Sequence, residues 1–149
     1  MKETIDIKIQ SNPKMMRLVR KVIGQACEIV GFSERDSHSV TLAVDEGCTN
    51  IMRHCYCGSQ TDQILIRIHM FDDKIEIMLK DFGHQIDVKK LRKCVEQRKR
   101  EMEQSGPVKP GGLGVMLIHS IMDKVDYRTS TDSGTVLRLI KYLSKTKEK

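Results

Sequence analysis

The sequence predicts an α+β fold, a two-layer sandwich in which helices cover one face of a mixed, mostly antiparallel sheet. The main observation is the order of elements along the chain: strand, helix, helix, hairpin, helix, helix, hairpin. Strands joined by tight turns are neighbours and run antiparallel. The length of 149 residues suits one compact domain. We therefore expect a single domain over residues 1–149, with no internal repeat or linker.

The first strand and the first two helices are marked by alternation and by helix-capping residues. Residues 4–9 alternate isoleucine with polar residues, which is typical of a half-buried strand. Ser11-Asn12-Pro13 marks the start of a helix, with the proline suited to its first turn, Gly31 suits its end, and Ser33 begins a second helix. In that second helix one stripe of residues at three- and four-residue spacing is expected to face the core. The stripe comprises Val40, Val44, Gly47, Cys48, Ile51 and Cys55.

The middle of the chain predicts an antiparallel hairpin. Residues 63–70 and 74–80 both alternate, and Asp72 and Asp73 part them. Isoleucine and leucine line one face of each run. These faces are expected to match in the folded hairpin.

The last third of the chain predicts two helices and a second hairpin. Residues 87–104 have helical propensity with weak amphipathicity, and residues 114–123 regain helical spacing. The alternating runs 125–131 and 135–143 flank a turn at residues 132–134.

Composition and charge exclude several classes of protein. No apolar run approaches the roughly 18 to 20 residues that span a bilayer, and the N-terminus lacks an apolar signal core, so we expect a soluble cytoplasmic protein that does not enter a membrane. The net charge is +6, but the basic residues are spread along the chain and aromatic residues make up 4%. Direct nucleic-acid binding is therefore not expected. An acidic protein surface or a polyphosphate ligand explains the charge as well.

The five cysteines predict neither a disulfide framework nor a zinc site. They contain no pair at CxxC spacing. The stretch from His54 to Cys57 offers a histidine and two thiols that could begin a metal site, but ordinary reduced, half-buried cysteines account for it and are the favoured interpretation.

Asp81 stands where the alternation before it calls for a buried apolar residue. If the strand continues, Asp81 faces the core, where a carboxylate needs a donor. If the strand ends at Lys80, Asp81 opens a turn with Gly83 instead. Asp81-Phe82-Gly83 is also the metal-binding triplet of eukaryotic protein kinases, but the glycine-rich loop, strand lysine and catalytic loop of that class are missing.

A glycine-rich segment directly precedes the helix at residues 114–123. It reads Pro110-Gly111-Gly112-Leu113-Gly114. Glycine lets backbone N–H groups approach an anion, and a helix N-terminus favours phosphate. The segment has neither a Walker A motif nor a Rossmann fingerprint. A loop hinge remains the alternative interpretation.

Glu46 and Asn50 share a helix face outside the apolar stripe, with Arg53 one turn further on. Carboxylate and amide oxygens are ligands that suit magnesium, whose coordination is usually completed by water and phosphate. Surface positions without a ligand are the alternative for such a pair. Arg53 and His54 could contact phosphate or a partner, or lie on the surface.

Together these segments resemble the GHKL superfamily of ATP-binding domains. LAVDEGCTNIMRHCYCG resembles its N-box, DFG its G1 box and PGGLGVMLIHSIMD its G2 box, while GTVLRLIKYL resembles the strand that completes the pocket. Within the superfamily, LAVDEGCTN and PGGLG followed by Leu-Ile are typical of the bacterial anti-sigma factor serine kinases. The resemblance covers essentially the whole chain and implies a Bergerat-type ATP-binding fold.

The resemblance implies roles for the residues of these boxes. Glu46 would be the general base that takes the proton from a serine hydroxyl, and Asn50 would hold Mg²⁺ at the phosphates of ATP. Asp81, Gly83 and Thr135 would contact adenine. The residues expected around the phosphates are Gly111, Gly112, Leu113 and Gly114. Independently of the resemblance, Thr135 shares a strand face with Leu137 and Leu139, so its hydroxyl is expected to point inward, although β propensity alone also explains a threonine there.

The resemblance also implies partners. The family phosphorylates a serine on an anti-sigma factor antagonist of the STAS fold, and a homodimer of the kinase binds a sigma factor. Residues 84–110 would form a lid over the nucleotide, with Lys109 near phosphate. The alternative is a binding module in which ATP switches a protein interaction and no phosphoryl group moves.

Overall fold

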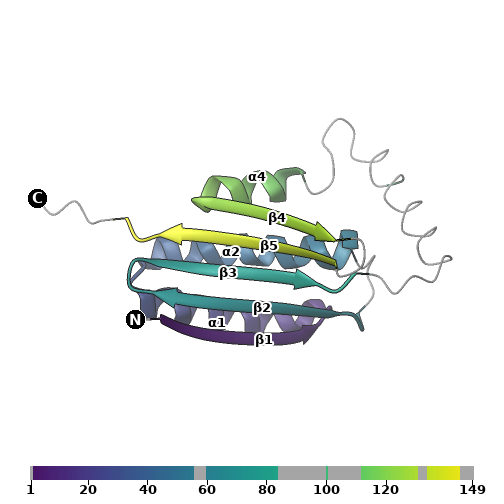
Figure 1. The fold of residues 1–149 in the computed structure, drawn as a ribbon, viewed down its shortest axis with the longest axis horizontal. Helices are drawn as coiled ribbons and strands as arrows, with labels where there is room; N and C mark the ends of the chain where they lie inside the picture. The colour runs from purple at the N-terminus through teal and green to yellow at the C-terminus, as the bar shows by residue number, and fades with distance from the viewer. Residues whose placement is uncertain (1, 56–59, 84–99, 101–111, 131–133, 145–149) are drawn as a thin grey trace, which may run out of the picture.

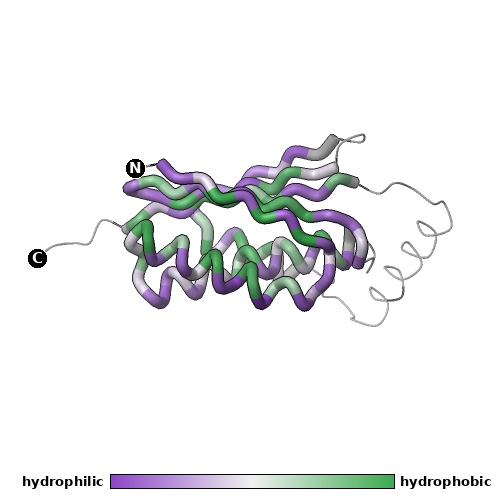
Figure 2. Tube along the Cα trace, turned by 90° about the horizontal axis from the view of Figure 1, so that it is seen from below, coloured by the Kyte–Doolittle hydropathy of each residue, from purple (hydrophilic) through white to green (hydrophobic). Residues whose placement is uncertain are grey.

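Three helices cover one face of a five-stranded sheet in the computed structural model (Figure 1), which describes residues 2–55, 60–83, 100, 112–130 and 134–144. Seen along the sheet, the strands form one layer and the helices a second (Figure 2). The elements are β1 (Lys2–Gln10), a 3-10 turn (Pro13–Met15), α1 (Met16–Val30), α2 (Glu34–Asn50), a π-helical turn (Ile51–Cys55), β2 (Gln63–Phe71), β3 (Lys74–Asp81), α4 (Gly112–Ile121), β4 (Lys124–Ser130) and β5 (Gly134–Tyr142). The predicted two-layer α+β sandwich is confirmed.

The strands lie in the order β1-β2-β3-β5-β4, and every neighbouring pair is antiparallel. The described part of the sheet therefore contains no parallel pair. The expected hairpins are β2–β3 and β4–β5. Because β5 inserts between β3 and β4, the start of β5 lies beside the end of β3. The candidate functional site includes this junction.

The core lies between the sheet and the helices. In the β2–β3 hairpin Ile66 is opposite Leu79 and Ile68 is opposite Ile77, and all four side chains are fully buried. These branched residues fit the pleated surface and fill the space under the helices. The predicted stripe of α2 is buried through Ile51, while the side chain of Cys55 lies outside the described residues.

The helix ends follow the predicted capping residues. The Asn12 side chain accepts a hydrogen bond from the Lys14 amide, and the Ser33 hydroxyl accepts one from the Asp36 amide at 3.1 Å. Gly31 ends α1 with φ of 111°, in the left-handed conformation that glycine adopts without strain.

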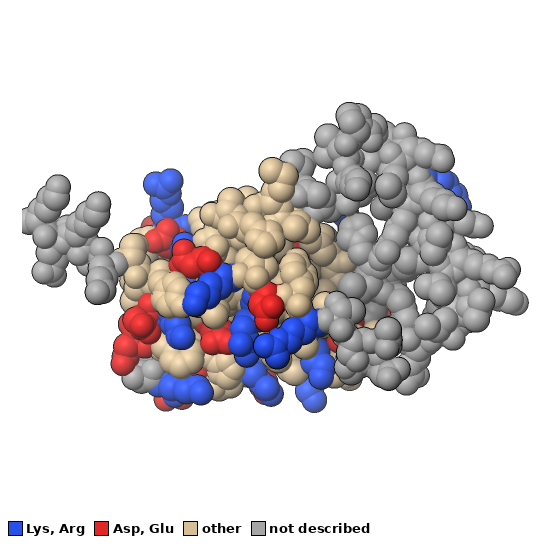
Figure 3. All heavy atoms as spheres, turned by 45° about the horizontal axis from the view of Figure 1, so that its top comes forward, with Lys and Arg blue, Asp and Glu red and all other residues tan. Residues whose placement is uncertain are grey.

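The outer face of the sheet, opposite the helices, carries interspersed basic and acidic side chains (Figure 3). Three ion pairs hold acidic residues of this face: Asp6 with Arg67, Glu76 with Arg138, and Asp126 with Arg128. Such exposed pairs contribute little to stability, typically about 0 to 1 kcal/mol each.

Several sequence predictions fall outside the described residues. These are the helix at residues 87–104, of which only Arg100 is described, the lid at residues 84–110, and the thiols of Cys57 and Cys94. Among the described residues no helix is long and apolar enough to cross a membrane.

Cys27 and Cys48 are buried free thiols in α1 and α2. Burial raises the pKa of the Cys27 thiol from 9.0 to about 12. The pKa of Cys48 rises to about 12 as well, through burial first and the negative charge of Asp45 second. Such thiols are inert in the folded state, since the thiolate is the reactive form.

We expect these thiols to make stability fall at alkaline pH. In the unfolded chain a thiol ionises near 9.0, whereas in the folded chain it stays protonated to about 12. The stabilisation is therefore complete below pH 9 and is lost as pH rises toward 12, by at most about 1.4 kcal/mol per pH unit for each thiol. Urea denaturation at about pH 8, 9 and 10, which covers the start of this window, measures how steeply the free energy of unfolding falls with pH. The double variant Cys27→Ala, Cys48→Ala should show a shallower fall, and equal slopes would contradict the assignment.

Candidate functional site

Asp81 is the last residue of β3 and lies in the core, with 3% of its surface exposed. It stands opposite Ile64 of β2, as the continued alternation requires. Its Oδ1 atom also accepts a hydrogen bond from the Gly83 amide at 3.0 Å, as an aspartate that opens a turn does. The strand interpretation of Asp81 is therefore confirmed, and the alternative that the strand ends at Lys80 is wrong, although Asp81 does make the turn contact with Gly83.

The second oxygen of Asp81 has no hydrogen-bond partner among the described residues. Oδ1 accepts from the amides of Gly83 and Thr135, the latter at 3.2 Å, whereas Oδ2 is buried and accepts from no donor in the described part of the chain. A buried unsatisfied acceptor costs about 1 to 3 kcal/mol. The arrangement therefore offers a strong, oriented acceptor to a ligand that carries an N–H group.

Two glycines with positive φ allow this arrangement. Gly83 has φ of 73° and Gly134 has φ of 87°. A Cβ atom on Gly134 would lie 2.6 Å from both Asp81 Oδ1 and the Gly83 nitrogen, and closer still to the Asp81 carbonyl oxygen. The sequence predicts Gly134 only as part of a turn, and no local signal indicates that it lies against Asp81.

Thr135 reaches Asp81 through its backbone. The hydrogen bond to Oδ1 comes from the Thr135 amide, which any residue other than proline could supply. The side chain of Thr135 is half-buried on β5, and Thr135 stands opposite Thr129 of β4. The predicted role of its hydroxyl stays a prediction.

Glu46 and Asn50 lie at the C-terminal end of α2, and both are half-buried. The start of α4 lies directly against them. A Cβ atom on Gly114 would be 2.6 Å from Glu46 Oε2 and 3.8 Å from Asn50 Nδ2. Glycine at this position therefore lets the backbone of α4 approach the carboxylate and the amide.

A contact at Gly47 joins this helix end to β3, which carries Asp81, and to β5, which carries Thr135. A Cβ atom on Gly47 would lie 2.5 Å from Leu79 Cδ1 in β3 and 3.4 Å from Leu137 Cδ2 in β5. Helix α2 thus packs very closely on the sheet next to Glu46. Figure 1 shows the end of β3, the end of α2 and the start of α4 at the same end of the molecule.

The structure describes some of the remaining predicted site residues and not others. Gly112 and Leu113 form the first turn of α4 together with Gly114, while Gly111 and Lys109 lie outside the described residues. Arg53 is exposed in the π-helical turn that continues α2, and the side chain of His54 is not described. Single π-turns inside helices often accompany functional sites.

The hydrogen-bonding groups of this site suit a nucleoside triphosphate. The buried Oδ2 of Asp81 needs a donor, which the exocyclic amine of adenine supplies. The first turn of α4 presents N–H groups with the positive end of a helix dipole, which favours phosphate. In the described part of the chain, no group of three His, Cys, Asp or Glu residues could hold a metal ion by itself.

Comparisons with known proteins agree with an ATP-binding site. The family model of the histidine kinase-like ATPase domain matches residues 9–141. The serine-protein kinase RsbW of Bacillus licheniformis is 28% identical over 95% of this chain and 86% of its own length. RsbW of Halalkalibacterium halodurans is 30% identical over 96% of this chain and 85% of its own length. In fold, the chain resembles a chain of the SiaB–SiaC complex of Pseudomonas aeruginosa, with a TM-score of 0.59 and 10% identity over 93% of this chain and 89% of that one.

We expect Gly134→Ala to disrupt the Asp81 site while Gly31→Ala does not. Both glycines have positive φ, so alanine costs about 1 to 2 kcal/mol at either position. At Gly31 the nearest atom to a new Cβ is 3.8 Å away, whereas at Gly134 the Cβ would overlap Asp81. Overpacking adds about 1 to 3 kcal/mol at Gly134. Urea unfolding measures both variants, and equal losses of stability would contradict the contact.

Proposed function

The chain belongs to the histidine kinase-like ATPase family, and from this premise we propose that it is an ATP-dependent serine-protein kinase. The resemblance to the GHKL domains is thereby confirmed. The observation that carries the nucleotide part of the proposal is the buried, unpartnered Oδ2 of Asp81. Relatives named serine-protein kinase over nearly the whole chain support the phosphoryl-transfer part.

Asp81 would select adenine. Its Oδ2 atom is positioned to accept from the exocyclic amine, while the backbone amides of Gly83 and Thr135 hold Oδ1 in place. Guanine carries a carbonyl oxygen at the corresponding position and would meet the carboxylate with an acceptor instead of a donor. The carboxylate therefore discriminates between the two purines by the direction of one hydrogen bond.

The first turn of α4 and the end of α2 would hold the phosphates and Mg²⁺. Backbone N–H groups from Gly112 to Gly114 would bind phosphate oxygens, and Gly111 and Leu113 belong to the same expected segment. Asn50 would coordinate Mg²⁺ through its side-chain oxygen. Because magnesium keeps several waters and binds substrate phosphates, one protein ligand at this position is sufficient.

Glu46 would be the general base. Its carboxylate lies beside Gly114, at the start of the helix that would bind the phosphates. When bound, ATP supplies the phosphoryl group. Glu46 would accept the proton from the attacking serine hydroxyl, a contribution of roughly 100- to 10,000-fold for a positioned base.

The proposed protein substrate is a STAS-type anti-sigma factor antagonist, and the proposed second partner is a sigma factor, which the chain would bind as a homodimer. These partners are what the family resemblance implies, and the names of the relatives support only the phosphorylation of a protein serine. A location in the cytoplasm stays a prediction from the sequence.

We expect Glu46→Gln to keep ATP binding but to lose phosphoryl transfer by at least about 100-fold, because an amide cannot accept the serine proton. Incubation with labelled ATP and each STAS protein encoded beside the gene measures transfer, and calorimetry measures ATP binding. Glu34→Gln, in the first turn of the same helix, is the matched control and should leave both unchanged.

Undiminished transfer by the Glu46 variant would refute the role of base. Absence of transfer by the unaltered protein, with ATP binding intact, would instead favour the ATP-switched binding module.

We expect Asp81→Asn to weaken ATP binding by about 1 to 3 kcal/mol, which is roughly 5- to 150-fold, since the amide keeps one oxygen and replaces the other acceptor with a donor. The loss should vanish for purine riboside triphosphate, which lacks the exocyclic amine. Titration of both nucleotides against both proteins measures the coupling as a double-mutant cycle. If the unaltered protein binds ATP and GTP equally, the adenine contact is wrong.

A further inference from the structure

The outer face of the sheet, opposite the helices, gathers basic side chains from all five strands. Alternation along the paired strands places eight basic residues and three acidic residues on this face, whereas the whole chain has 26 basic and 20 acidic residues. The basic residues are spread along the sequence, and the fold brings them to one surface. Five of the eight are lysines: Lys2, Lys8, Lys74, Lys80 and Lys124.

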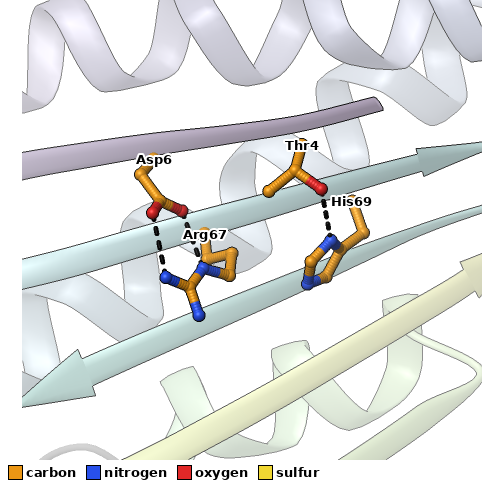
Figure 4. A network of polar contacts seen from close by, with 4 residues as sticks. All are labelled: Thr4, Asp6, Arg67 and His69. Carbon is orange, nitrogen blue, oxygen red and sulfur yellow. Dashed lines mark hydrogen bonds and ion pairs between the residues drawn. The ribbon is translucent and has the colours of Figure 1, made fainter. Parts of the chain in front are cut away.

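The three arginines of this face neutralise its three carboxylates. Arg67 donates two hydrogen bonds to Asp6, at 2.8 and 2.9 Å, as Figure 4 shows. The hydrogen bond from Arg67 lowers the pKa of Asp6, so the carboxylate stays charged in the pair. The other two pairs are Arg138 with Glu76 and Arg128 with Asp126. The excess of positive charge on the outer face therefore belongs to the five lysines.

Four of these lysines lie over aromatic rings of the same face. The ammonium group of Lys74 is 4.8 Å from the centroid of the Phe71 ring and 5.9 Å from the centroid of the Tyr142 ring. Such contacts hold a lysine side chain in place without cancelling its charge. The ammonium groups are therefore positioned to meet the anionic groups of a ligand. The other pairs are Lys2 with Phe71 at 5.6 Å, Lys124 with Tyr142 at 5.6 Å and Lys80 with Phe82 at 5.1 Å.

The lysines stand at the two ends of an apolar strip. Lys74 and Lys80 lie near opposite ends of β3, roughly 20 Å apart by the rise of a strand. Between their rows lie the half-buried side chains of Met78 on β3 and Ile140 on β5. Lys8 continues the row of Lys80 on β1, across Leu65 of β2. The outer face thus combines an apolar middle with a basic group at each end.

The segments of this chain that lie outside the described residues are too basic to complement this face. Residues 84–111, of which only Arg100 is described, contain eight basic and four acidic residues. Residues 145–149 contain three basic residues and one acidic residue. The same face of a second copy would present lysines to lysines. The complementary ligand is therefore a separate molecule that carries acidic groups.

The pattern on the face favours a protein over a nucleic acid or a membrane surface. The rings of Phe71 and Tyr142 each contact two ammonium groups already, whereas single-stranded nucleic acids stack their bases on open rings. The three carboxylates lie in the middle rows, where a phosphate backbone or an anionic lipid surface would meet like charge. A protein can instead place apolar side chains in the middle and carboxylates at the ends, as interfaces with an apolar centre and a polar rim do.

We propose that the outer face of the sheet binds an acidic amphipathic helix of a partner protein, which lies along β3 and β5. The apolar side of the helix packs on Met78 and Ile140, and carboxylates at its two ends meet the two groups of lysines. A helix of about 13 residues spans the roughly 20 Å between these groups. Glu46 and Asn50 lie in the helix layer on the other side of the sheet. The inference therefore goes beyond the proposed function, because it assigns a second protein-binding surface that leaves the nucleotide site open.

Fluorescence anisotropy with a labelled synthetic peptide tests the proposal. The probe is a helix-forming peptide with leucine along one side and glutamate in its first and last turns, and its control carries glutamine in place of glutamate. The unaltered chain is expected to bind the glutamate peptide at least about tenfold more tightly than the glutamine peptide. The double variant Lys74→Glu, Lys80→Glu should lose this preference. A third peptide, with lysine in place of glutamate, should bind that variant more tightly than it binds the unaltered chain.

Matched variants separate this surface from charge and hydrophobicity in general. The double variant Lys14→Glu, Lys21→Glu makes the same change of charge at exposed lysines of the helix layer and should bind the glutamate peptide as the unaltered chain does. Met78→Ser should weaken binding, whereas Met116→Ser, at a methionine of α4 that is 68% exposed, should not. Urea unfolding checks that each variant is folded, and the milder pair Lys74→Gln, Lys80→Gln should also reduce the preference for glutamate.

Three results would overturn the proposal. They are equal binding of the glutamate and glutamine peptides, binding that neither the Lys74 and Lys80 variants nor Met78→Ser weaken, and tighter binding of oligothymidine or phosphatidylglycerol vesicles than of the glutamate peptide. The peptide measurements need neither ATP nor phosphoryl transfer. Failure of this docking surface and failure of the proposed kinase activity are therefore separate results.

Discussion

The close packing of α2 on the sheet at Gly47 determines the whole candidate site. With a hydrogen atom for a side chain, Gly47 lets the helix approach Leu79 of β3 and Leu137 of β5 more closely than any other residue could. Glu46 is the preceding residue and Asn50 is one turn further along. Leu79 lies two residues before Asp81, and Leu137 lies two residues after Thr135. One contact therefore fixes the end of the helix that carries Glu46 and Asn50 relative to the two strands that carry Asp81 and Thr135.

The burial of the Asp81 carboxylate lowers the stability of the fold. A carboxylate at a core position is unfavourable unless its oxygens are hydrogen-bonded. Two backbone amides satisfy Oδ1, but the described residues leave Oδ2 without a donor. Replacing Asp81 by an apolar residue would remove that cost, so its presence needs a reason outside the packing of the core. A ligand that donates to Oδ2 supplies one.

The sequence predicts most of the fold because its signals are local. Alternating isoleucines mark the strands, and Asn12, Gly31 and Ser33 mark helix ends through contacts within a few residues. The site is less predictable, because its decisive contacts join distant segments. Nothing local signals that Gly134 touches Asp81 or that the Thr135 backbone, rather than its hydroxyl, holds the carboxylate. For Asp81 itself, the local sequence opposes a buried strand residue to a turn residue, whereas its backbone ends the strand and its Oδ1 atom accepts from the turn.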